Sequence, residues 1–173
     1  MEKNIVLVGF MGSGKTSVGK RLSMALKREF IDMDDFIEKR EGMTINEIFA
    51  QKGEPYFRGL EMELCARFAA GGGKVIATGG GVVKNAENVA NLKKGGVIFY
   101  LKSTPEKIAD NLKNDNTRPL LAVEDKTAKI AELMREREGF YNACADIVTD
   151  VSQKEIEQTT QEILKDMERF DKQ

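Results

Sequence analysis

Residues 9–16 read Gly9-Phe10-Met11-Gly12-Ser13-Gly14-Lys15-Thr16, which matches the pattern G-x-x-x-x-G-K-[ST] at every fixed position. The β-rich segment Asn4–Val8 precedes this stretch, and a helical apolar spacing follows it. Glycines in such a loop let backbone N–H groups point at phosphate oxygens, and the next helix adds its N-terminal donors. The stretch therefore predicts a strand–loop–helix unit that binds a nucleotide phosphate.

The predicted nucleotide site comprises Gly12, Ser13, Gly14, Lys15, Thr16 and Ser17. Lys15 is expected to reach the β- and γ-phosphates, and the Thr16 hydroxyl is a natural ligand for Mg²⁺. The alternative, a glycine-rich turn followed by a chance Lys-Thr pair, is disfavoured because the strand and helix flank the motif in the required order.

The rest of the chain alternates short apolar runs with amphipathic stretches, which favours a βαβ series and a parallel sheet. Capping boxes are predicted at Thr44 with Glu47 and at Ser152 with Glu155. Pro105 after Thr104 predicts a helix start. The further predicted strands are Phe30–Met33, Lys74–Thr78, Val97–Leu101 and Asp146–Thr149.

Length and composition are those of one globular domain, residues 1–173, with a formal net charge of -1. This charge balance gives no reason to expect nucleic acid or an anionic membrane as partner. The two cysteines form no disulfide framework and suit a reducing cytoplasm. No signal peptide and no membrane-spanning run are recognised, so a cytoplasmic location is expected.

The chain contains no histidine. Mechanisms that require an imidazole base, a phosphohistidine or a histidine metal ligand are therefore excluded. A proton acceptor must be a carboxylate or water. A metal site built from oxygen ligands would suit Mg²⁺.

Two carboxylates, Asp32 and Asp34, lie at the end of the second predicted strand. If strand geometry persists through both residues, their side chains point to the same side, at the sheet edge where ligands bind. One can hold Mg²⁺ through water while the other accepts the proton of an attacking hydroxyl. The alternative is that Asp34 or Asp35 only caps a helix.

Of two triple glycines, Gly71–Gly73 is explained by helix termination, whereas Gly79, Gly80 and Gly81 follow a predicted strand at the ligand-binding edge. Arg58, Arg118 and Arg137 each have an ordinary surface interpretation. For Arg58 this is an ion-pair face with Glu54 and Glu61. The residues alone do not bring these arginines together.

P-loops occur in nucleotide-dependent switches, motors and kinases. Two sequence motifs that are missing from this chain narrow the choice among these protein classes. No Asn-Lys-x-Asp guanine-reading motif is present, and no long apolar strand ends in a lone aspartate. The pattern favours a kinase that phosphorylates a hydroxyl of a small molecule.

The whole set resembles the shikimate kinase family over about residues 3–165. The resemblance is carried by the P-loop, Asp32-Met33-Asp34, Phe57-Arg58 with Glu61, Thr78-Gly79-Gly80-Gly81, Arg118-Pro119-Leu120-Leu121 and Arg137…Tyr141. It implies a three-layer α/β/α fold of the P-loop kinase type, with a five-stranded parallel sheet in the order 2-3-1-4-5. It also implies a substrate-binding segment at 33–60 and a mobile lid at 112–124.

The implied reaction is transfer of phosphate from ATP to the 3-hydroxyl of shikimate, in the route to aromatic amino acids, by a monomer. Asp34 would hold substrate hydroxyls and act as base, with Lys15 and Arg118 as the other catalytic groups. Arg118 would contact ATP phosphates from the lid, and Asp32 would support Mg²⁺ with Thr16. Substrate binding would fall to Asp34, Arg58, Gly79, Gly80, Gly81 and Arg137.

Three departures from the family pattern are visible, the first being that the adenine-side loop after the fifth predicted strand, Asp150–Gln153, is short. Arg137 is followed by Glu-Gly-Phe-Tyr, without the usual proline, and Gly139 is expected to loosen that helix. Residues 110–113 contain no arginine to stack on adenine. The alternatives are a gluconate or nucleoside monophosphate kinase of the same fold, a nucleotide-dependent switch domain, and an inactive homologue.

Overall fold

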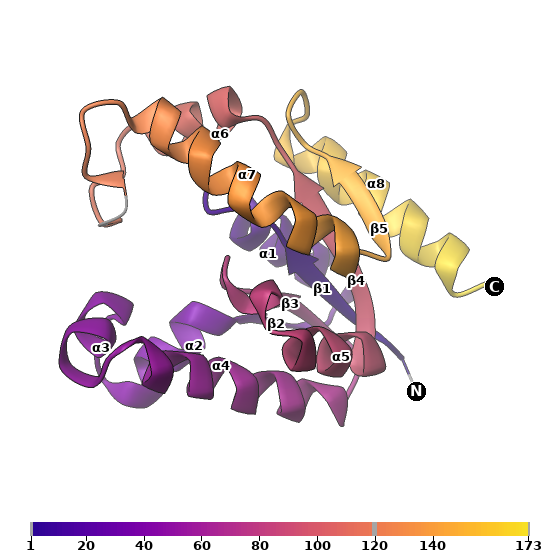
Figure 1. The fold of residues 1–173 in the computed structure, drawn as a ribbon. Helices are drawn as coiled ribbons and strands as arrows, with labels where there is room; N and C mark the ends of the chain where they lie inside the picture. The colour runs from indigo at the N-terminus through magenta and orange to yellow at the C-terminus, as the bar shows by residue number, and fades with distance from the viewer. Residues whose placement is uncertain (1, 119–120, 173) are drawn as a thin grey trace.

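The computed structural model describes residues 2–118 and 121–172 as one α/β unit (Figure 1). Its five-stranded sheet has the order β2-β3-β1-β4-β5, and every pairing is parallel. The predicted strand order is therefore confirmed. The strands are β1 Asn4–Val8, β2 Glu29–Asp32, β3 Lys74–Ala77, β4 Gly96–Lys102 and β5 Ile147–Asp150.

Helices cover both faces of the sheet, as the three-layer prediction requires (Figure 1). They are α1 Lys15–Leu26, α2 Met33–Glu41, α3 Ile45–Lys52, α4 Glu54–Ala69, α5 Ala86–Gly95, α6 Pro105–Asn111, α7 Lys126–Cys144 and α8 Ile156–Phe170, with a 3₁₀ turn η1 at Val82–Lys84. Among the described residues, none of these helices is long and apolar enough to cross a bilayer.

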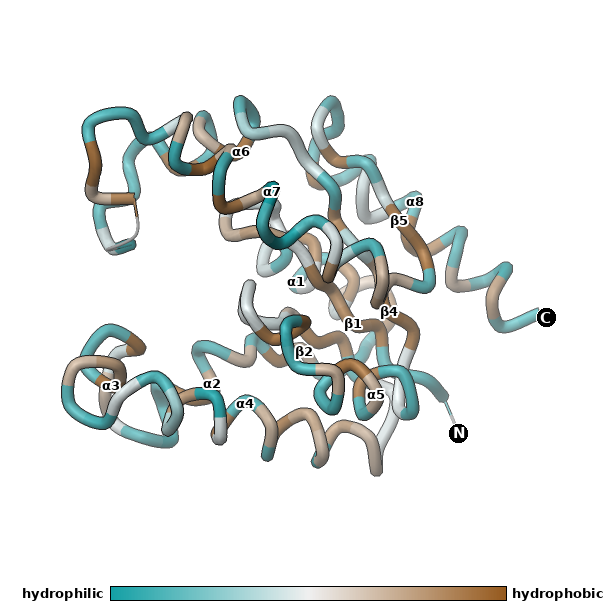
Figure 2. The backbone as a smooth tube through the Cα atoms, viewed as in Figure 1, coloured by the Kyte–Doolittle hydropathy of each residue, from teal (hydrophilic) through white to brown (hydrophobic). Residues whose placement is uncertain are grey.

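The alternation of side chains along β1 divides the core in two. Ile5 and Leu7 pack with α1 and α8 on one face, whereas Val6 and Val8 pack on the other face. All four are fully buried, as expected for a central parallel strand covered on both sides. Figure 2 shows these apolar strands in the middle of the fold, beneath more polar helices.

Two helix starts test the predicted caps. Thr44 and Glu47 form the predicted capping box at α3, with the Glu47 amide donating to Thr44 Oγ1 at 3.2 Å. The second predicted box is wrong. The Ser152 hydroxyl donates to Asp150 at 2.6 Å, and α8 begins one turn later with Glu155 as its cap.

Helix α7 continues without interruption from Lys126 to Cys144. The expectation that Gly139 loosens this helix is therefore wrong. Both cysteines are free, as expected for a chain without a disulfide framework, and both are buried. Burial raises the pKa of the Cys65 thiol to about 12, so this side chain behaves as a small hydrophobic residue.

Candidate active site

The P-loop connects β1 to α1 at the carboxyl end of the sheet. Gly12 and Gly14 have left-handed backbone angles, with φ of 75° and 93°, which explains why glycine is needed there. Ser13 is buried within the loop, and Lys15, Thr16 and Ser17 form the first turn of α1. The predicted nucleotide-binding residues therefore occupy one continuous loop and helix start.

The Lys15 ammonium lies inside this loop. Its Nζ donates to the carbonyl oxygens of Gly9 at 2.6 Å and Phe10 at 3.0 Å. Burial lowers the pKa of Lys15 to about 8, while the charge of Asp34 acts in the opposite direction. A buried ammonium ion of this kind gains strongly from an anionic partner such as a phosphate group.

Asp32 and Asp34 lie close together, but not on one strand. Strand β2 ends at Asp32, whose carboxylate accepts from the backbone amides of Asp34 and Asp35 and so caps α2. Asp34 belongs to the first turn of that helix. The expectation that strand geometry persists is therefore wrong, and the predicted capping role belongs to Asp32 itself.

The two carboxylates have different surroundings. Asp32 Oδ2 accepts from the Thr16 hydroxyl at 2.7 Å. Asp34 Oδ1 is buried, with no hydrogen-bond partner among the described residues. Burial, reinforced by the neighbouring charge of Asp32, raises the pKa of Asp34. An unpartnered carboxylate oxygen at this edge is free to accept a hydrogen bond from a ligand.

The residues around Thr16 are compatible with Mg²⁺ only if the nucleotide supplies further ligands. No group of three acidic, histidine or cysteine side chains among residues 2–118 and 121–172 can hold a metal. Thr16 and Asp32 offer one hydroxyl and one carboxylate, already in contact. This sparse oxygen set fits Mg²⁺, which usually keeps several waters and takes substrate phosphates as ligands.

Each glycine of Gly79–Gly81 contacts a different functional side chain. A Cβ at Gly79 would lie 2.8 Å from Asp34 Oδ1, and one at Gly81 would lie 2.7 Å from Arg58 NH1. A Cβ at Gly80 would lie 3.2 Å from Arg137 NH1. This glycine loop therefore lies against three predicted substrate residues, and a side chain at Gly79 or Gly81 would require Asp34 or Arg58 to shift.

Arg58 reaches the glycine loop from α4. Its NH1 donates to Glu61 Oε1 at 2.6 Å, and its NH2 donates to Glu54 at 3.2 Å. The Glu61 side chain is only 1% exposed, so the expectation of a solvated ion-pair face is wrong for this partner. The buried carboxylate orients the guanidinium toward the glycine loop.

Arg137 reaches the same loop from α7, on the opposite side. Its guanidinium carbon lies 5.5 Å from the centre of the Phe10 ring, within the range of a cation–π interaction. Tyr141, one turn further along α7, donates its hydroxyl to the Gly80 carbonyl at 2.7 Å. The sequence pattern by itself assigns no role to Phe10 or Tyr141. The i, i+4 spacing of Arg137 and Tyr141 nevertheless places those two side chains on one face of the helix.

Arg118 lies in the segment between α6 and α7, next to the P-loop. Its side chain is 40% exposed and pairs with Asp115 at 3.1 Å. Its positive charge contributes to lowering the pKa of Lys15. Pro119 and Leu120, which belong to the predicted lid at 112–124, lie outside the described residues.

The base of this segment is attached to the P-loop, and its far part reaches the helix α3. Asn111 donates to the Gly12 carbonyl at 2.8 Å, and a Cβ at Gly12 would lie 2.8 Å from Leu112. Asn46 of α3 donates to the Thr117 carbonyl at 3.0 Å. Figure 1 shows the segment projecting on the same side of the molecule as α3.

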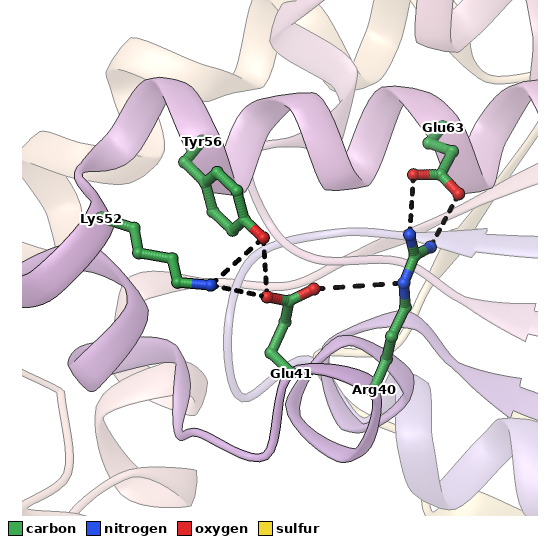
Figure 3. Close-up of polar contacts among 5 residues, drawn as sticks. All are labelled: Arg40, Glu41, Lys52, Tyr56 and Glu63. Atoms are coloured by element: carbon green, nitrogen blue, oxygen red, sulfur yellow. Dashed lines mark hydrogen bonds and ion pairs between the residues drawn. The ribbon is translucent and has the colours of Figure 1, made fainter.

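A surface network joins α2, α3 and α4 (Figure 3). Glu41 accepts from the Tyr56 hydroxyl at 2.7 Å and from Lys52 at 3.2 Å, and Arg40 pairs with Glu63 at 2.7 Å. These contacts hold together the three helices that supply Asp34, Asn46 and Arg58.

Comparison with known proteins agrees with this geometry. A family model described as "Shikimate kinase" matches residues 11–168. A shikimate kinase of Caldanaerobacter subterraneus subsp. tengcongensis is 50% identical, covering 94% of this chain and 95% of that protein. A shikimate kinase of Thermodesulfovibrio yellowstonii is 46% identical, covering 97% of this chain and 96% of that protein.

Among solved structures, a shikimate kinase from Acinetobacter baumannii in complex with shikimate superposes with a TM-score of 0.90. It is 36% identical, and the match covers 96% of this chain and 93% of that chain. The P-loop, the acidic pair and the glycine loop follow three neighbouring parallel strands at one edge of the sheet, and the chain belongs to the shikimate kinase family.

Proposed function

We propose that this protein transfers the γ-phosphoryl group of ATP to the 3-hydroxyl of shikimate, giving ADP and shikimate 3-phosphate. The observation that carries the proposal is the meeting of Asp34, Arg58 and Arg137 on the three consecutive glycines. These groups offer a proton acceptor and two carboxylate-binding cations around one small space, which suits a hydroxylated carboxylic acid.

In this proposal Asp34 accepts the proton of the 3-hydroxyl as its oxygen attacks the γ-phosphorus, and the bond to ADP breaks. The buried, unpartnered Asp34 oxygen supports the role. Lys15 and Arg118 stabilise the charge that builds on the transferred group and on ADP. The hydrogen bonds of Lys15 within the P-loop, and the contact of Asn111 with Gly12 at the base of the segment that carries Arg118, support this assignment.

The substrate carboxylate would bind Arg58 and Arg137, whose guanidinium groups match a planar carboxylate bidentately. Gly79, Gly80 and Gly81 would allow close approach of the ring, and a side chain at Gly79 or Gly81 would collide with Asp34 or Arg58. The complex of the Acinetobacter relative with shikimate supports the choice of ligand.

Mg²⁺ would be held by Thr16, by Asp32 directly or through water, and by phosphate oxygens. When bound, it would neutralise phosphate charge during transfer. The contact between Thr16 and Asp32 supports this assignment. The nucleotide phosphates would lie on the backbone of Gly12, Ser13 and Gly14 and the first turn of α1 through Ser17.

The working unit would be one kinase domain and a monomer in the cytoplasm, without nucleic-acid or membrane partners. Residues 33–60 would form the substrate-binding segment, and residues 112–124 a lid that carries Arg118 to the phosphates. The contact between Asn46 and Thr117, which links these two segments, supports their cooperation.

A coupled ADP-release assay over a panel of acceptors tests the proposal, with shikimate, gluconate and nucleoside monophosphates at equal concentrations. ADP release should require shikimate, and phosphorus NMR should find one new phosphomonoester at its 3-position. Equal turnover with gluconate or a nucleoside monophosphate would contradict the proposal. ATP hydrolysis unaffected by any acceptor would favour a nucleotide-dependent switch.

A further inference from the structure

A cavity of about 190 Å³ lies between the end of β4, the start of α6 and one face of α7. Its walls include Phe10, Tyr100, Pro105, Met134 and Tyr141. None of the residues proposed for catalysis or substrate binding lines it. It is therefore separate from the space above the glycine loop, although Phe10 and Tyr141 form part of the boundary between the two.

The walls of this cavity are mostly aromatic and apolar. The rings of Tyr100 and Tyr141 stack with centres 5.0 Å apart and planes 24° from parallel. Burial raises the pKa of both tyrosines to about 12, so their rings are neutral at ordinary pH. An apolar cavity of roughly 150 Å³ is known to hold a benzene ring, so the volume here suits a single ring with a short substituent.

One charged group of the wall lacks a partner. Arg135, an exposed side chain on α7, makes no ion pair or side-chain hydrogen bond within residues 2–118 and 121–172. Glu138, an acidic residue of the wall, pairs with Lys102 at 3.1 Å. The rim of the cavity therefore carries one cation, Arg135, that no acidic side chain of the described residues neutralises.

We propose that this cavity binds a small aromatic monocarboxylate, with the ring against Tyr100, Met134 and Tyr141 and the carboxylate on Arg135. The donors of a guanidinium group suit a carboxylate acceptor. The aromatic walls favour a planar ring over an aliphatic chain of the same size. The site is independent of the phosphoryl-transfer centre, so its failure would leave the proposed function untouched.

Phenylacetate is a suitable probe, and its affinity can be measured by calorimetry on the full-length protein. Ala131→Leu should fill the cavity and Arg135→Gln should remove its cation, and both replacements are good helix formers. Lys129→Gln, on the same helix but outside the cavity wall, is the matched control. Circular dichroism should show that all three variants stay folded.

We expect phenylacetate to bind the wild type and the control alike, and each cavity variant at least about tenfold more weakly, the low end for a hydrogen bond to a charged group. Phenylacetamide should bind wild type about tenfold more weakly than phenylacetate, and Arg135→Gln should remove this difference. Saturating shikimate and ADP should not displace the probe. No binding, displacement by shikimate or ADP, or unchanged affinity in Arg135→Gln would each overturn the proposal.

Discussion

Asp34 and Asp35 are neighbours on α2, yet only Asp34 faces the glycine loop. Its Oδ1 is buried and unpartnered, while Asp35 is exposed. The amide of Asp34, and not its carboxylate, is bound to Asp32. The Asp34 carboxylate is therefore available for chemistry rather than needed for the fold.

Asp34→Asn should lower turnover by at least ~10²-fold, because an amide cannot accept the hydroxyl proton. Asp35→Asn, one residue away, should leave turnover nearly unchanged. Asp32→Asn keeps a good helix cap, and should instead raise the Mg²⁺ concentration needed for half-maximal activity. A Mg²⁺ titration of the activity of the three variants tests which carboxylate supports Mg²⁺ and which accepts the proton. If Asp34→Asn alone shifted that titration, the two roles would be reversed.

Lys15→Ala should abolish phosphoryl transfer, because it removes the cation that the loop holds at the phosphate position. The melting temperature should stay close to that of the wild type, since the lost contacts are two hydrogen bonds within a loop. Turnover and thermal melting should be measured on the same sample. Turnover within tenfold of the wild type would show that the P-loop is not the catalytic site.

At the scale of elements, the two triple glycines of this chain serve different purposes. A Cβ at Gly71 meets nothing within 4 Å, whereas one at Gly79 would lie 2.8 Å from Asp34 and 3.0 Å from Glu61. Gly79 has an ordinary backbone φ, so the constraint on it comes from its neighbours and not from strain.

Gly79→Ala should therefore cut turnover strongly by displacing Asp34, while Gly71→Ala should leave turnover unchanged. Steady-state kinetics of the two variants provide the test, with circular dichroism as a check on folding. Wild-type turnover in folded Gly79→Ala would mean that the glycine loop is not packed against the base.

The segment 112–124 joins the P-loop at its base and α3 through Asn46. Arg118→Ala should reduce turnover more than it weakens ADP binding without acceptor, because Arg118 is expected to act in the closed state. Lys113→Ala removes an exposed cation from the same segment and is the control. Proteolysis within 112–124 should slow when both substrates bind. Absence of this protection would argue against a lid.

At the scale of the whole molecule, local patterns predicted what local interactions determine. The P-loop, the five strands and the Thr44 cap follow from neighbours in sequence, and the structure confirms them, except that Met33, predicted as the end of a strand, begins α2. The spacing of Ser152 and Glu155 suits a capping box, but the Ser152 hydroxyl donates to Asp150 instead. Nothing in the spacing distinguishes a capping box from this local hydrogen bond. The spacing likewise does not reveal that Asp32 caps α2, so that β2 ends at Asp32 and Asp34 lies in the helix.

The site itself depends on long-range packing, which residue spacing does not encode. Arg58 lies on α4 and Arg137 on α7, and each resembles a surface residue within its own helix. Only the fold brings them to Gly81 and Gly80. Family resemblance supplied this expectation, and the burial of Glu61 could not have been read from its i+3 spacing to Arg58.

Arg58 and Arg137, far apart in the sequence, are proposed to bind the substrate carboxylate at the glycine loop. This can be measured with a double cycle, in which the substrate carboxylate and each arginine are changed separately and together. Arg58→Lys and Arg137→Lys replace a planar fork by a point charge. Hydrogen bonds to charged groups contribute about 1.5–3 kcal/mol each. Each change should therefore raise the shikimate KM by tens-fold and leave ATP binding nearly intact.

The wild type should use the uncharged carboxamide of shikimate poorly, and either arginine variant should lose much less with this analogue than with shikimate. That non-additive result would place the carboxylate on Arg58 and Arg137. Equal losses for shikimate and its carboxamide in both variants would contradict the account, because the arginines would then not recognise the carboxylate.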